Sequence, residues 1–409
     1  MKLDNDFVRA QFPAFEEPSL AGQAMFENAG GSYACRQVID RLTRFYRERK
    51  VQPYYAFEPS RLGGEEMDEA RRRLAEIMGV ETDEVSFGPS TTQNTYVLAQ
   101  AFGELLSAGH AVIVTNQDHE ANSGPWRRLA DRDIEIREWK INADTGELPI
   151  DGLKALLDDK VKLVCFPHCS NVVAEINPVA EICALVRDAG AYSCVDGVSY
   201  APHGLPNVAA LGADIYMYSA YKTYGPHQGI MVLRRGIGEA LPNQGHFFNA
   251  DTLYKRMTPA GPDHAQVAAS AGMADYIDDL YAHHTDKQAA APAVERGAHV
   301  SALMRGYEIE LARPVLDFLK SKNSVRLLGP SDPVKRAPTI TVVSETPGND
   351  LAAALAPKGI MAAGGNFYGV RCLEAMGVDP AHGALRVSFV HYTSKEEIDK
   401  LLNALDEVL

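Results

Sequence analysis

Short apolar segments alternate with amphipathic segments through the middle of the chain. The nearly continuous apolar runs, typical of strands covered on both faces, are Glu84–Phe87, Ala111–Thr115, Ile134–Trp139, Lys162–Phe166, Tyr192–Val195, Ile215–Tyr218 and Ile230–Leu233. Between them, apolar residues recur at three- and four-residue spacing in Asn94–Leu106, Pro125–Asp131, Gly152–Asp158 and Val179–Ala189. This alternation predicts helices between the strands of a largely parallel α/β sheet. Because the later strands have shorter connections, we expect at least one antiparallel strand.

The pattern changes after about residue 290. A helix-like stretch, Ala289–Arg305, precedes short strands at Ser324–Leu328 and Thr339–Val343. Two further helices, Asp350–Ala356 and Lys395–Val408, flank a strand at Leu385–Val390. The order of these elements predicts a smaller α+β domain. We expect a large α/β domain over residues 20–285 and a small domain formed by residues 1–19 and 286–409.

Composition and charge narrow the class of partner. The chain has 409 residues, 46% of them hydrophobic, and a formal net charge of −14 without a Lys/Arg run. These values exclude a disordered chain or a disulfide-stapled miniprotein and argue against nucleic-acid binding, which needs a concentrated basic surface. The N-terminus MKLDNDFVRAQF lacks the apolar core of a secretory signal, and no stretch approaches the ~20 apolar residues of a membrane span. We therefore expect a cytoplasmic protein with a small-molecule partner.

The cysteines give no sign of disulfides or of a metal site. Cys35, Cys165, Cys169, Cys183, Cys194 and Cys372 are scattered without CxxC spacing, which favours buried free thiols. Cys165 and Cys169 flank His168, but neighbours on an extended segment point to opposite faces and no second ligand pair follows. We expect no metal.

Two ionisable residues follow neighbouring predicted strands. Asp196 ends one buried strand, at the edge where open α/β sheets bind ligands, and its charge needs a cationic partner there. Lys222 follows the next strand between Tyr221 and Tyr224, where partial desolvation would lower its pKa and make it a candidate Schiff-base nucleophile. Taken singly, each residue is better explained without a function, Asp196 as a helix cap and Lys222 as a solvated loop residue.

Two further loops fit the same ligand, one with a cationic ring, an aldehyde and a phosphate. The segment Phe87-Gly-Pro-Ser-Thr-Thr-Gln-Asn94 joins a strand to a helix through hydroxyl residues, either as an anion site or as an ordinary N-cap. His119 ends another strand, where it can face a flat ring, move protons or simply lie at the surface. No GxGxxG follows a strand and no GxxxxGK[ST] loop is present, which argues against a nicotinamide dehydrogenase or a nucleoside triphosphatase.

These residues together resemble the class V aminotransferases, and within them the cysteine-desulfurase-like branch of the fold-type I enzymes that use pyridoxal 5'-phosphate (PLP). The resemblance runs from Phe26-Glu-Asn-Ala-Gly30 to the C-terminus and implies a PLP-dependent transferase-like fold, with a mainly parallel seven-stranded sheet and a smaller α+β domain. It implies that Lys222 forms the aldimine with the cofactor, that Asp196 pairs with the ring nitrogen, and that His119 stacks on the ring. The other implied cofactor-binding residues are Asn171, Ser90, Thr91, Thr92, Ser199, His203, Ser219 and Tyr221.

On the substrate side, the resemblance assigns the substrate carboxylate to Arg386, in Leu385-Arg-Val-Ser388, and places Asn28 near the substrate. It also implies a homodimer with active sites at the subunit interface. The chain departs from the family where a Gln is replaced by Ser199, a His by Tyr221, and Ala-Gly-Thr-Pro by Ala260-Gly-Pro-Asp263.

The reaction depends on where a nucleophilic thiol stands. A desulfurase needs a thiolate on a mobile loop before the carboxylate-binding arginine. Matching by the glycine motif places Tyr368 at that position, whereas matching by distance to Arg386 places Cys372 nearby. We therefore expect transamination or β-elimination on a small amino acid. The alternatives are a cysteine desulfurase that uses Cys372 and a non-catalytic PLP-binding protein.

Overall fold

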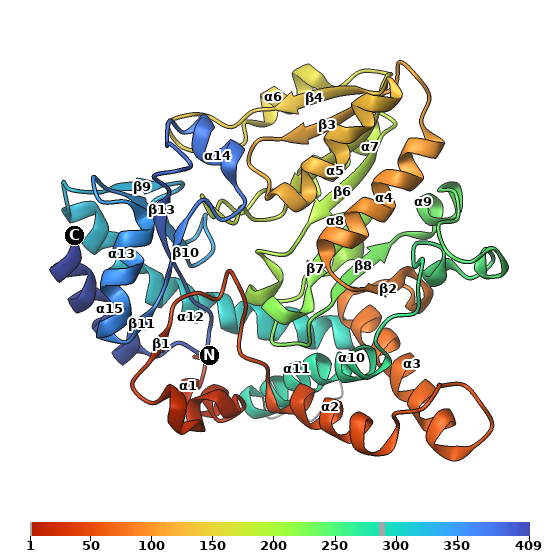
Figure 1. The fold of residues 1–409 in the computed structure, drawn as a ribbon, viewed down its shortest axis with the longest axis horizontal. Coiled ribbons are helices and arrows are strands. Elements are labelled where there is room, and N and C mark those ends of the chain that lie inside the picture. Colours follow the sequence, from red (N-terminus) through yellow and green to blue (C-terminus); the bar gives the residue numbers. More distant parts are fainter. Residues whose placement is uncertain (1, 286–290) are drawn as a thin grey trace.

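A computed structural model of the protein describes residues 2–285 and 291–409. Its largest sheet has seven strands in the order β2-β8-β7-β6-β5-β3-β4, drawn from orange to green in Figure 1. β8 is antiparallel to both β2 and β7, and the other pairs are parallel. The strands are β2 (Val85–Gly88), β3 (Ala111–Thr115), β4 (Glu135–Trp139), β5 (Val161–Pro167), β6 (Tyr192–Asp196), β7 (Ile215–Ser219) and β8 (Gly229–Leu233). The predicted mainly parallel sheet with an antiparallel member is confirmed.

Helices connect these strands. They are α4 (Thr91–Leu105), α5 (Gly124–Arg127), α6 (Ile150–Leu156), α7 (Val179–Asp188) and α8 (Val208–Leu211), and α9 (Arg235–Ala240) follows β8. The single helix predicted over Pro125–Asp131 is wrong, because α5 ends at Arg127 and a 3-10 helix covers Arg128–Arg132. Trp126 and Leu129 are buried against the sheet, which produced the helical spacing. The chain then reverses at Asp133 (φ 59°) and enters β4, so a longer helix has no room.

Another helical group packs beside the sheet and was not predicted. It comprises α2 (Arg36–Glu48), α3 (Glu58–Met78), α10 (His264–Ala269) and α11 (Ala271–His284), which contact one another along the lower edge of Figure 1. Gly272 lets α11 approach α2 closely, because a β-carbon at this residue would lie 2.5 Å from the backbone nitrogen of Val38. The buried apolar side chains of these four helices belong to the same hydrophobic core as one face of the large sheet.

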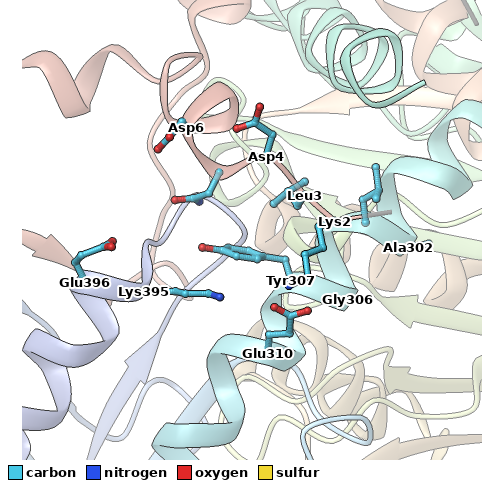
Figure 2. Close-up of a pocket in the computed structure, with 12 residues that line it drawn as sticks. Lys2, Leu3, Asp4, Asp6, Ala302, Gly306, Tyr307, Glu310, Lys395 and Glu396 are labelled. Atoms are coloured by element: carbon cyan, nitrogen blue, oxygen red, sulfur yellow. The ribbon is translucent and has the colours of Figure 1, made fainter. Parts of the chain in front are cut away.

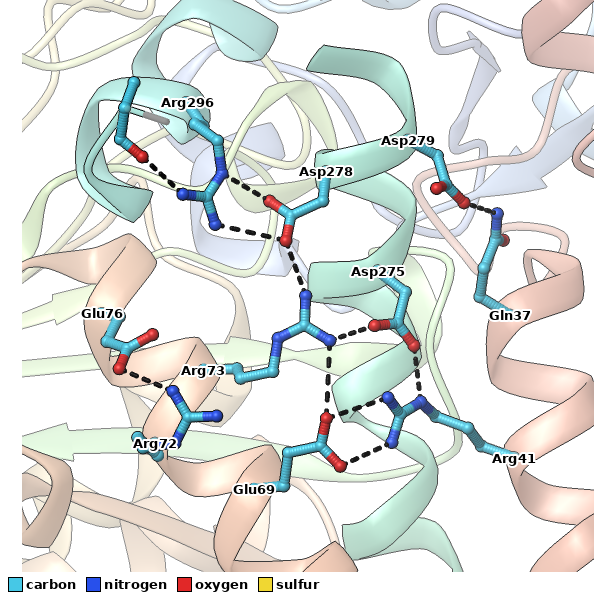
Figure 3. Close-up of polar contacts among 11 residues, drawn as sticks. Gln37, Arg41, Glu69, Arg72, Arg73, Glu76, Asp275, Asp278, Asp279 and Arg296 are labelled. Carbon is cyan, nitrogen blue, oxygen red and sulfur yellow. Dashed lines mark hydrogen bonds and ion pairs between the residues drawn. The ribbon is translucent and has the colours of Figure 1, made fainter. Parts of the chain in front are cut away.

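A continuous ion-pair network crosses this helical group (Figure 3). Arg41 Nε donates to Asp275 (2.5 Å), and the two Nη atoms of Arg41 donate to Glu69 (3.0 and 3.1 Å). Arg73 pairs with Asp275 and donates to Asp278 at 2.7 Å. Arg41 holds the pKa of the Glu69 carboxyl below its usual range, although burial opposes the shift. A network of this kind contributes more to stability than isolated surface pairs do, since each charge has several partners.

The C-terminal part forms a separate sheet with its own core. Strands β9 (Arg326–Leu328), β10 (Thr339–Val343), β12 (Ala363–Gly365) and β13 (Ala384–Ser388) pair in the order β12-β13-β10-β9, beside α13 (Gly348–Leu355), α14 (Val370–Ala375) and α15 (Lys395–Val408). The long helix α12 (Ala293–Ser321) contributes Leu311, Val315 and Leu316 to this second core. The helix predicted from Ala289 to Arg305 begins later, at Ala293, and continues further, to Ser321. Residues 289 and 290 of the predicted helix lie outside the described residues.

The N-terminal segment packs against both parts. Helix α1 (Asn5–Arg9) reaches the C-terminal region through Arg9, which donates to the Tyr392 carbonyl (2.9 Å) and to Glu397 (2.7 Å). Strand β1 (Ala24–Met25) pairs with β11 (Ile360–Met361). A cavity of about 410 Å³ lies between residues 2–6 and helices α12 and α15 (Figure 2).

The predicted division of the chain into a domain of residues 20–285 and a domain of residues 1–19 with 286–409 stays a prediction, and residues 286–290 are outside the described part. No described helix is long and apolar enough to cross a membrane.

Candidate active site

The ends of five strands of the large sheet surround one pocket. Ser90 to Thr92 follow β2, His119 follows β3, Asn171 follows β5, Asp196 ends β6 and Ser219 ends β7. The pocket is lined by Ser90, Thr91, Thr92, His119, Ala121, Pro167, Cys169, Asn171, Asp196, Val198, Ser199, Ser219, Tyr221 and Lys222. This is the edge at which open α/β sheets bind ligands, because the loops after parallel strands converge there.

The start of α4 supplies hydroxyl and backbone donors at one end of the pocket. Ser90 caps the helix by accepting a hydrogen bond from Gln93 N–H (3.2 Å), and Thr91 Oγ1 lies 2.9 Å from Ser219 Oγ. Gly229 on β8 is in close contact with this turn, because a β-carbon there would lie 2.4 Å from Thr91 N. Free N–H groups and the positive end of a helix of this length favour an anion.

Asp196 and Lys222 both line the pocket. Asp196 is 6% exposed and accepts a hydrogen bond from Val198 N–H (2.8 Å). Burial raises the pKa of Asp196 to about 6, against the lowering influences of Val198 N–H and of Lys222. Burial and the nearby charge of Arg386 lower the pKa of Lys222 to about 8. A lysine with this pKa has a substantial fraction of neutral, nucleophilic amine near neutral pH.

His119 stands beside a loop from the C-terminal sheet. Its Nδ1 accepts a hydrogen bond from Ala121 N–H (3.0 Å), and its ring centroid lies 5.4 Å from that of Tyr368. Burial lowers the pKa of His119 to about 3, and Lys222 and Arg386 lower it further. The ring is therefore neutral at physiological pH, with Nδ1 as acceptor and Nε2 carrying the proton.

Residues 366–369 form a loop that crosses from β12 to the pocket. Phe367 (φ 53°) and Tyr368 (φ 55°) both adopt left-handed backbone, which costs about 1–3 kcal/mol for each non-glycine residue. Residues that follow β3 and β5 hold this loop at two points, since Asn171 Nδ2 donates to the Phe367 carbonyl and Glu120 N–H donates to the Tyr368 carbonyl, each at 2.8 Å. Glu120 also pairs with Arg371 at the start of α14. These contacts fix Tyr368, whose side chain is 71% exposed, at the rim of the site.

Arg386 on β13 lies beside this pocket, in contact with Asn171, although it is not among the residues that line the pocket. Its Nη2 donates to Glu27 Oε1 (2.6 Å), its Nη1 donates to the Asn171 carbonyl (3.1 Å), and its guanidinium lies 4.2 Å from the centroid of the Phe367 ring. Its Nε is buried without a hydrogen-bond partner in the described structure. Glu27 and Phe367 were missed by sequence reasoning. Glu27 adjoins Asn28 in the motif already singled out, but nothing in the spacing shows that it meets Arg386.

Two of the predicted site residues lie on another side of Lys222. His203 and Asn28 line a small cavity that also includes Ser199 and Lys222. His203 Nδ1 lies 3.0 Å from Glu308 Oε1, and Asn28 Nδ2 donates to the Ser388 carbonyl (3.1 Å) while Asn28 Oδ1 accepts from Tyr392. Neither residue lines the pocket of Asp196 and His119, so the cofactor-binding role of His203 and the substrate-binding role of Asn28 stay predictions.

The six cysteines are all free and buried. Cys372 lies in α14 with no exposed surface, and burial raises its pKa to about 12. Cys169 lines the pocket, but it is 2% exposed, its thiol lies 3.4 Å from the Ala174 carbonyl, and burial raises its pKa to about 12 as well. A neutral, enclosed thiol is a poor nucleophile, since the thiolate is the reactive form.

Comparisons with known proteins agree with this fold. The family profile described as Aminotransferase class-V matches residues 24–248 and 294–401. The aminotransferase-like protein FGM3 of Gibberella zeae is 31% identical over 98% of this chain and 98% of its own length. A cysteine desulfurase of Yersinia pestis is 28% identical over 100% of this chain and 99% of its own length.

Solved structures show the same fold. The apo structure of cysteine desulfurase from Thermococcus onnurineus NA1 matches with a TM-score of 0.85 and 21% identity, over 100% of this chain and 98% of that one. The cysteine desulfurase CsdA of Escherichia coli matches with a TM-score of 0.83 and 21% identity, over 100% of this chain and 99% of that one. The fold and the matching family profile define an α/β enzyme that uses PLP. The chain belongs to the class-V aminotransferase family. The sequence-based predictions of family, fold, enzyme class and cofactor are confirmed.

The described residues fit this cofactor. The start of α4 presents hydrogen-bond donors that can bind a phosphate. The buried Asp196 carboxylate would be stabilised by a cationic N–H group beside it. Lys222 offers an amine with a lowered pKa. Asn171 Oδ1 is buried without a hydrogen-bond partner in the described part of the chain, although Asn171 lines the pocket. An unpaired buried acceptor of this kind is costly unless a ligand pairs with it.

Proposed function

We propose that the protein catalyses transamination or β-elimination on a small amino acid, with Lys222 as the residue that binds PLP. The supporting observation is that Lys222, Asp196 and His119 line one pocket. Arg386 lies close enough for its positive charge to lower the pKa of both Lys222 and His119. PLP bound there would supply an electron sink for breaking a bond at the substrate Cα.

The side chains divide the work by position and charge. Ser90, Thr91, Thr92 and Ser219 would hold the phosphate, helped by the backbone N–H groups of α4. The Asp196 carboxylate would keep a proton on the ring nitrogen, which strengthens the electron sink. His119, neutral and oriented through Nδ1, would lie against the ring, while Asn171, Ser199 and Tyr221 would contact its edge and the phosphate. Lys222, with its lowered pKa, is suited to carry a proton to and from Cα.

Arg386 would bind the substrate carboxylate. Its buried, unpaired Nε supports this role, because an unpaired donor on a guanidinium is an open position for an anionic ligand. Phe367 covers one face of the guanidinium and restricts the direction of approach. These features favour a substrate with an amino acid carboxylate and do not determine the side chain of that substrate.

Cysteine desulfuration through Cys372 is the second candidate function, because cysteine desulfurases are among the relatives. The burial and raised pKa of Cys372 argue against it, and so does the backbone-anchored Tyr368 loop, since a persulfide nucleophile must reach the substrate sulfur. The intact set of Lys222, Asp196 and His119 argues against a non-catalytic PLP-binding protein.

We also propose a cytoplasmic homodimer with active sites at the subunit interface. Exposed aromatic side chains at Tyr55 (59%), Phe57 (53%), Phe247 (87%) and Phe248 (70%) support an interface, because such surfaces are usually covered by a partner. Six free cysteines are typical of a reducing compartment. Size-exclusion chromatography with light scattering tests the dimer, and a single-chain mass would contradict it.

An amino acid panel tests the reaction. PLP-loaded protein is incubated with L-amino acids, with and without pyruvate as amino acceptor, and assayed for keto acid, ammonia and sulfide. Dithiothreitol is present throughout as the two-electron reductant that releases the outer sulfur of a persulfide as sulfide. Acceptor-dependent keto acid indicates transamination, and ammonia without an acceptor indicates elimination. Sulfide from cysteine that disappears in Cys372→Ser would overturn the proposal in favour of the desulfurase, and no product from any amino acid would overturn both.

A further inference from the structure

The arginine assigned to the substrate carboxylate already has an internal carboxylate partner. Arg386 is 4% exposed, and its Nη2 donates to Glu27 Oε1 at 2.6 Å. The Asn171 carbonyl accepts from Nη1, so both outer nitrogens of the fork contact the protein. Only Nε lacks a partner among the described residues. Because a free arginine fork binds a carboxylate through two parallel N–H bonds, a substrate must share this arginine with Glu27.

The position of the Glu27 carboxylate is set from two sides. Backbone pairing between Glu27 and Ser388 places Glu27 beside the strand that carries Arg386. On the other side lies Gly30, where a β-carbon would be 1.9 Å from Glu27 Oε2 and 2.7 Å from Cδ. The absence of a side chain at Gly30 therefore leaves the space that the carboxylate occupies. Gly30 is exposed and its φ is not in the left-handed region, so alanine there displaces the carboxylate without straining the backbone.

The negative charge of Glu27 acts on Lys222, the amine proposed to react. Glu27 raises the pKa of Lys222, whereas Arg386 lowers it, so both residues lie within electrostatic range of the lysine amine. An additional anionic group on the substrate would meet the negative charge of Glu27. A neutral or cationic substrate side chain would meet no such repulsion.

We propose that Glu27 is a specificity-determining residue that restricts the site to substrates with one carboxylate and disfavours dicarboxylic amino acids. The proposal rests on the proposed function, because it assumes that Arg386 receives the substrate carboxylate. It differs from that function in naming the residue that limits which carboxylates bind.

The test compares two unreactive anions, acetate and succinate, by calorimetry with PLP-loaded wild-type protein, Glu27→Gln and Gly30→Ala. Glu27→Gln removes the charge and keeps the shape, while Gly30→Ala keeps the charge and moves the carboxylate. Glu76→Gln is the control, because this exposed glutamate on α3 pairs only with Arg72 on the same helix in the described contacts. We expect the affinity for succinate relative to acetate to rise about tenfold in both site variants, the effect of one nearby charge interaction, and to stay unchanged in the control.

A ratio within twofold of the wild-type value in both Glu27→Gln and Gly30→Ala, or no detectable binding in any of the proteins, would overturn the proposal. If Glu27→Gln does not fold, Gly30→Ala decides alone. Failure of the proposed function is seen separately in the same samples, because the absorbance band of bound PLP would be missing from the wild-type protein.

Discussion

Thr91 Oγ1 lies 2.9 Å from Ser219 Oγ, although the two residues are 128 positions apart. One hydroxyl belongs to the first turn of α4 and the other ends β7, so the pair joins two loops of the pocket at the start of the helix. Gly229 on the neighbouring strand contacts the backbone of Ser90 and Thr91. This packing fixes the place where the helix N-terminus meets the proposed phosphate.

Gly229→Ala tests this packing. The new β-carbon would lie 2.3 Å from the Ser90 carbonyl carbon and 2.4 Å from Thr91 N, so the start of α4 has to move. We expect a loss of about 1–3 kcal/mol in unfolding free energy, measured with urea, together with weaker binding of PLP. Gly236→Ala is the matched control, since nothing lies within 4 Å of its β-carbon. The control should gain about 0.4–1 kcal/mol and bind PLP normally. Unchanged PLP binding in Gly229→Ala would contradict the proposed phosphate site.

The pKa of Lys222 predicts a pH dependence of cofactor binding. Because the neutral amine is the nucleophile, the rate at which cofactor-free protein incorporates PLP should rise with a midpoint near pH 8. Removing the positive charge in Arg386→Gln should move the midpoint to higher pH, because Arg386 lowers the lysine pKa. Stopped-flow absorbance between pH 6 and 10 measures the midpoint. A midpoint near ~10.4, the value for an ordinary lysine, would contradict the proposed environment.

Asp196→Ala should impair catalysis more than cofactor retention. The carboxylate is expected to keep the ring nitrogen protonated, whereas the phosphate contacts at α4 hold the cofactor in place. We expect turnover to fall about 10²-fold or more while most of the protein still retains PLP after desalting. Steady-state rates and the absorbance of the desalted protein give the two quantities. Turnover equal to that of the wild type would contradict the assignment of Asp196.

The cysteines should be unreactive in the folded protein. All six are buried, and burial raises the pKa of Cys372 to about 12. Ellman's reagent should therefore modify no thiol in native protein and all six after denaturation in guanidinium. Cys372→Ser should keep wild-type turnover with every amino acid that the wild type accepts. One rapidly reacting thiol in the native protein, lost in Cys372→Ser, would instead favour the desulfurase.

The sheet and the residues on its strand ends were predictable because local pattern determines them. Apolar runs such as Ala111–Thr115 coincide with the observed β3, and Asp196 and Lys222 were placed at the pocket because parallel strands end at one edge. Helices α2 and α3 were not predicted, because their burial depends on partners such as α10 and α11 that are distant in sequence. The prediction of one helix over Pro125–Asp131 was wrong because the apolar spacing of this segment suits a 3-10 turn against the sheet as well as an α-helix.

The substrate side of the site was less predictable. The contact between Arg386 and Glu27 joins residues 359 positions apart, and no pattern along the chain reports it. The anchoring of the Tyr368 loop likewise depends on hydrogen bonds that its carbonyls accept from Glu120 N–H and from Asn171 Nδ2. Sequence comparison with the family identified Arg386, but the partner that shares its guanidinium required three-dimensional contacts.

The attachment of PLP to Lys222 is the central claim, and borohydride reduction followed by peptide mass spectrometry tests it most directly. PLP-loaded protein should show an absorbance band near the visible edge that disappears on reduction, and the pyridoxyl label should be found on the peptide that contains Lys222. Lys222→Ala should retain no label after denaturation and washing. A label on another lysine, or no label in PLP-loaded wild-type protein, would contradict the proposed site.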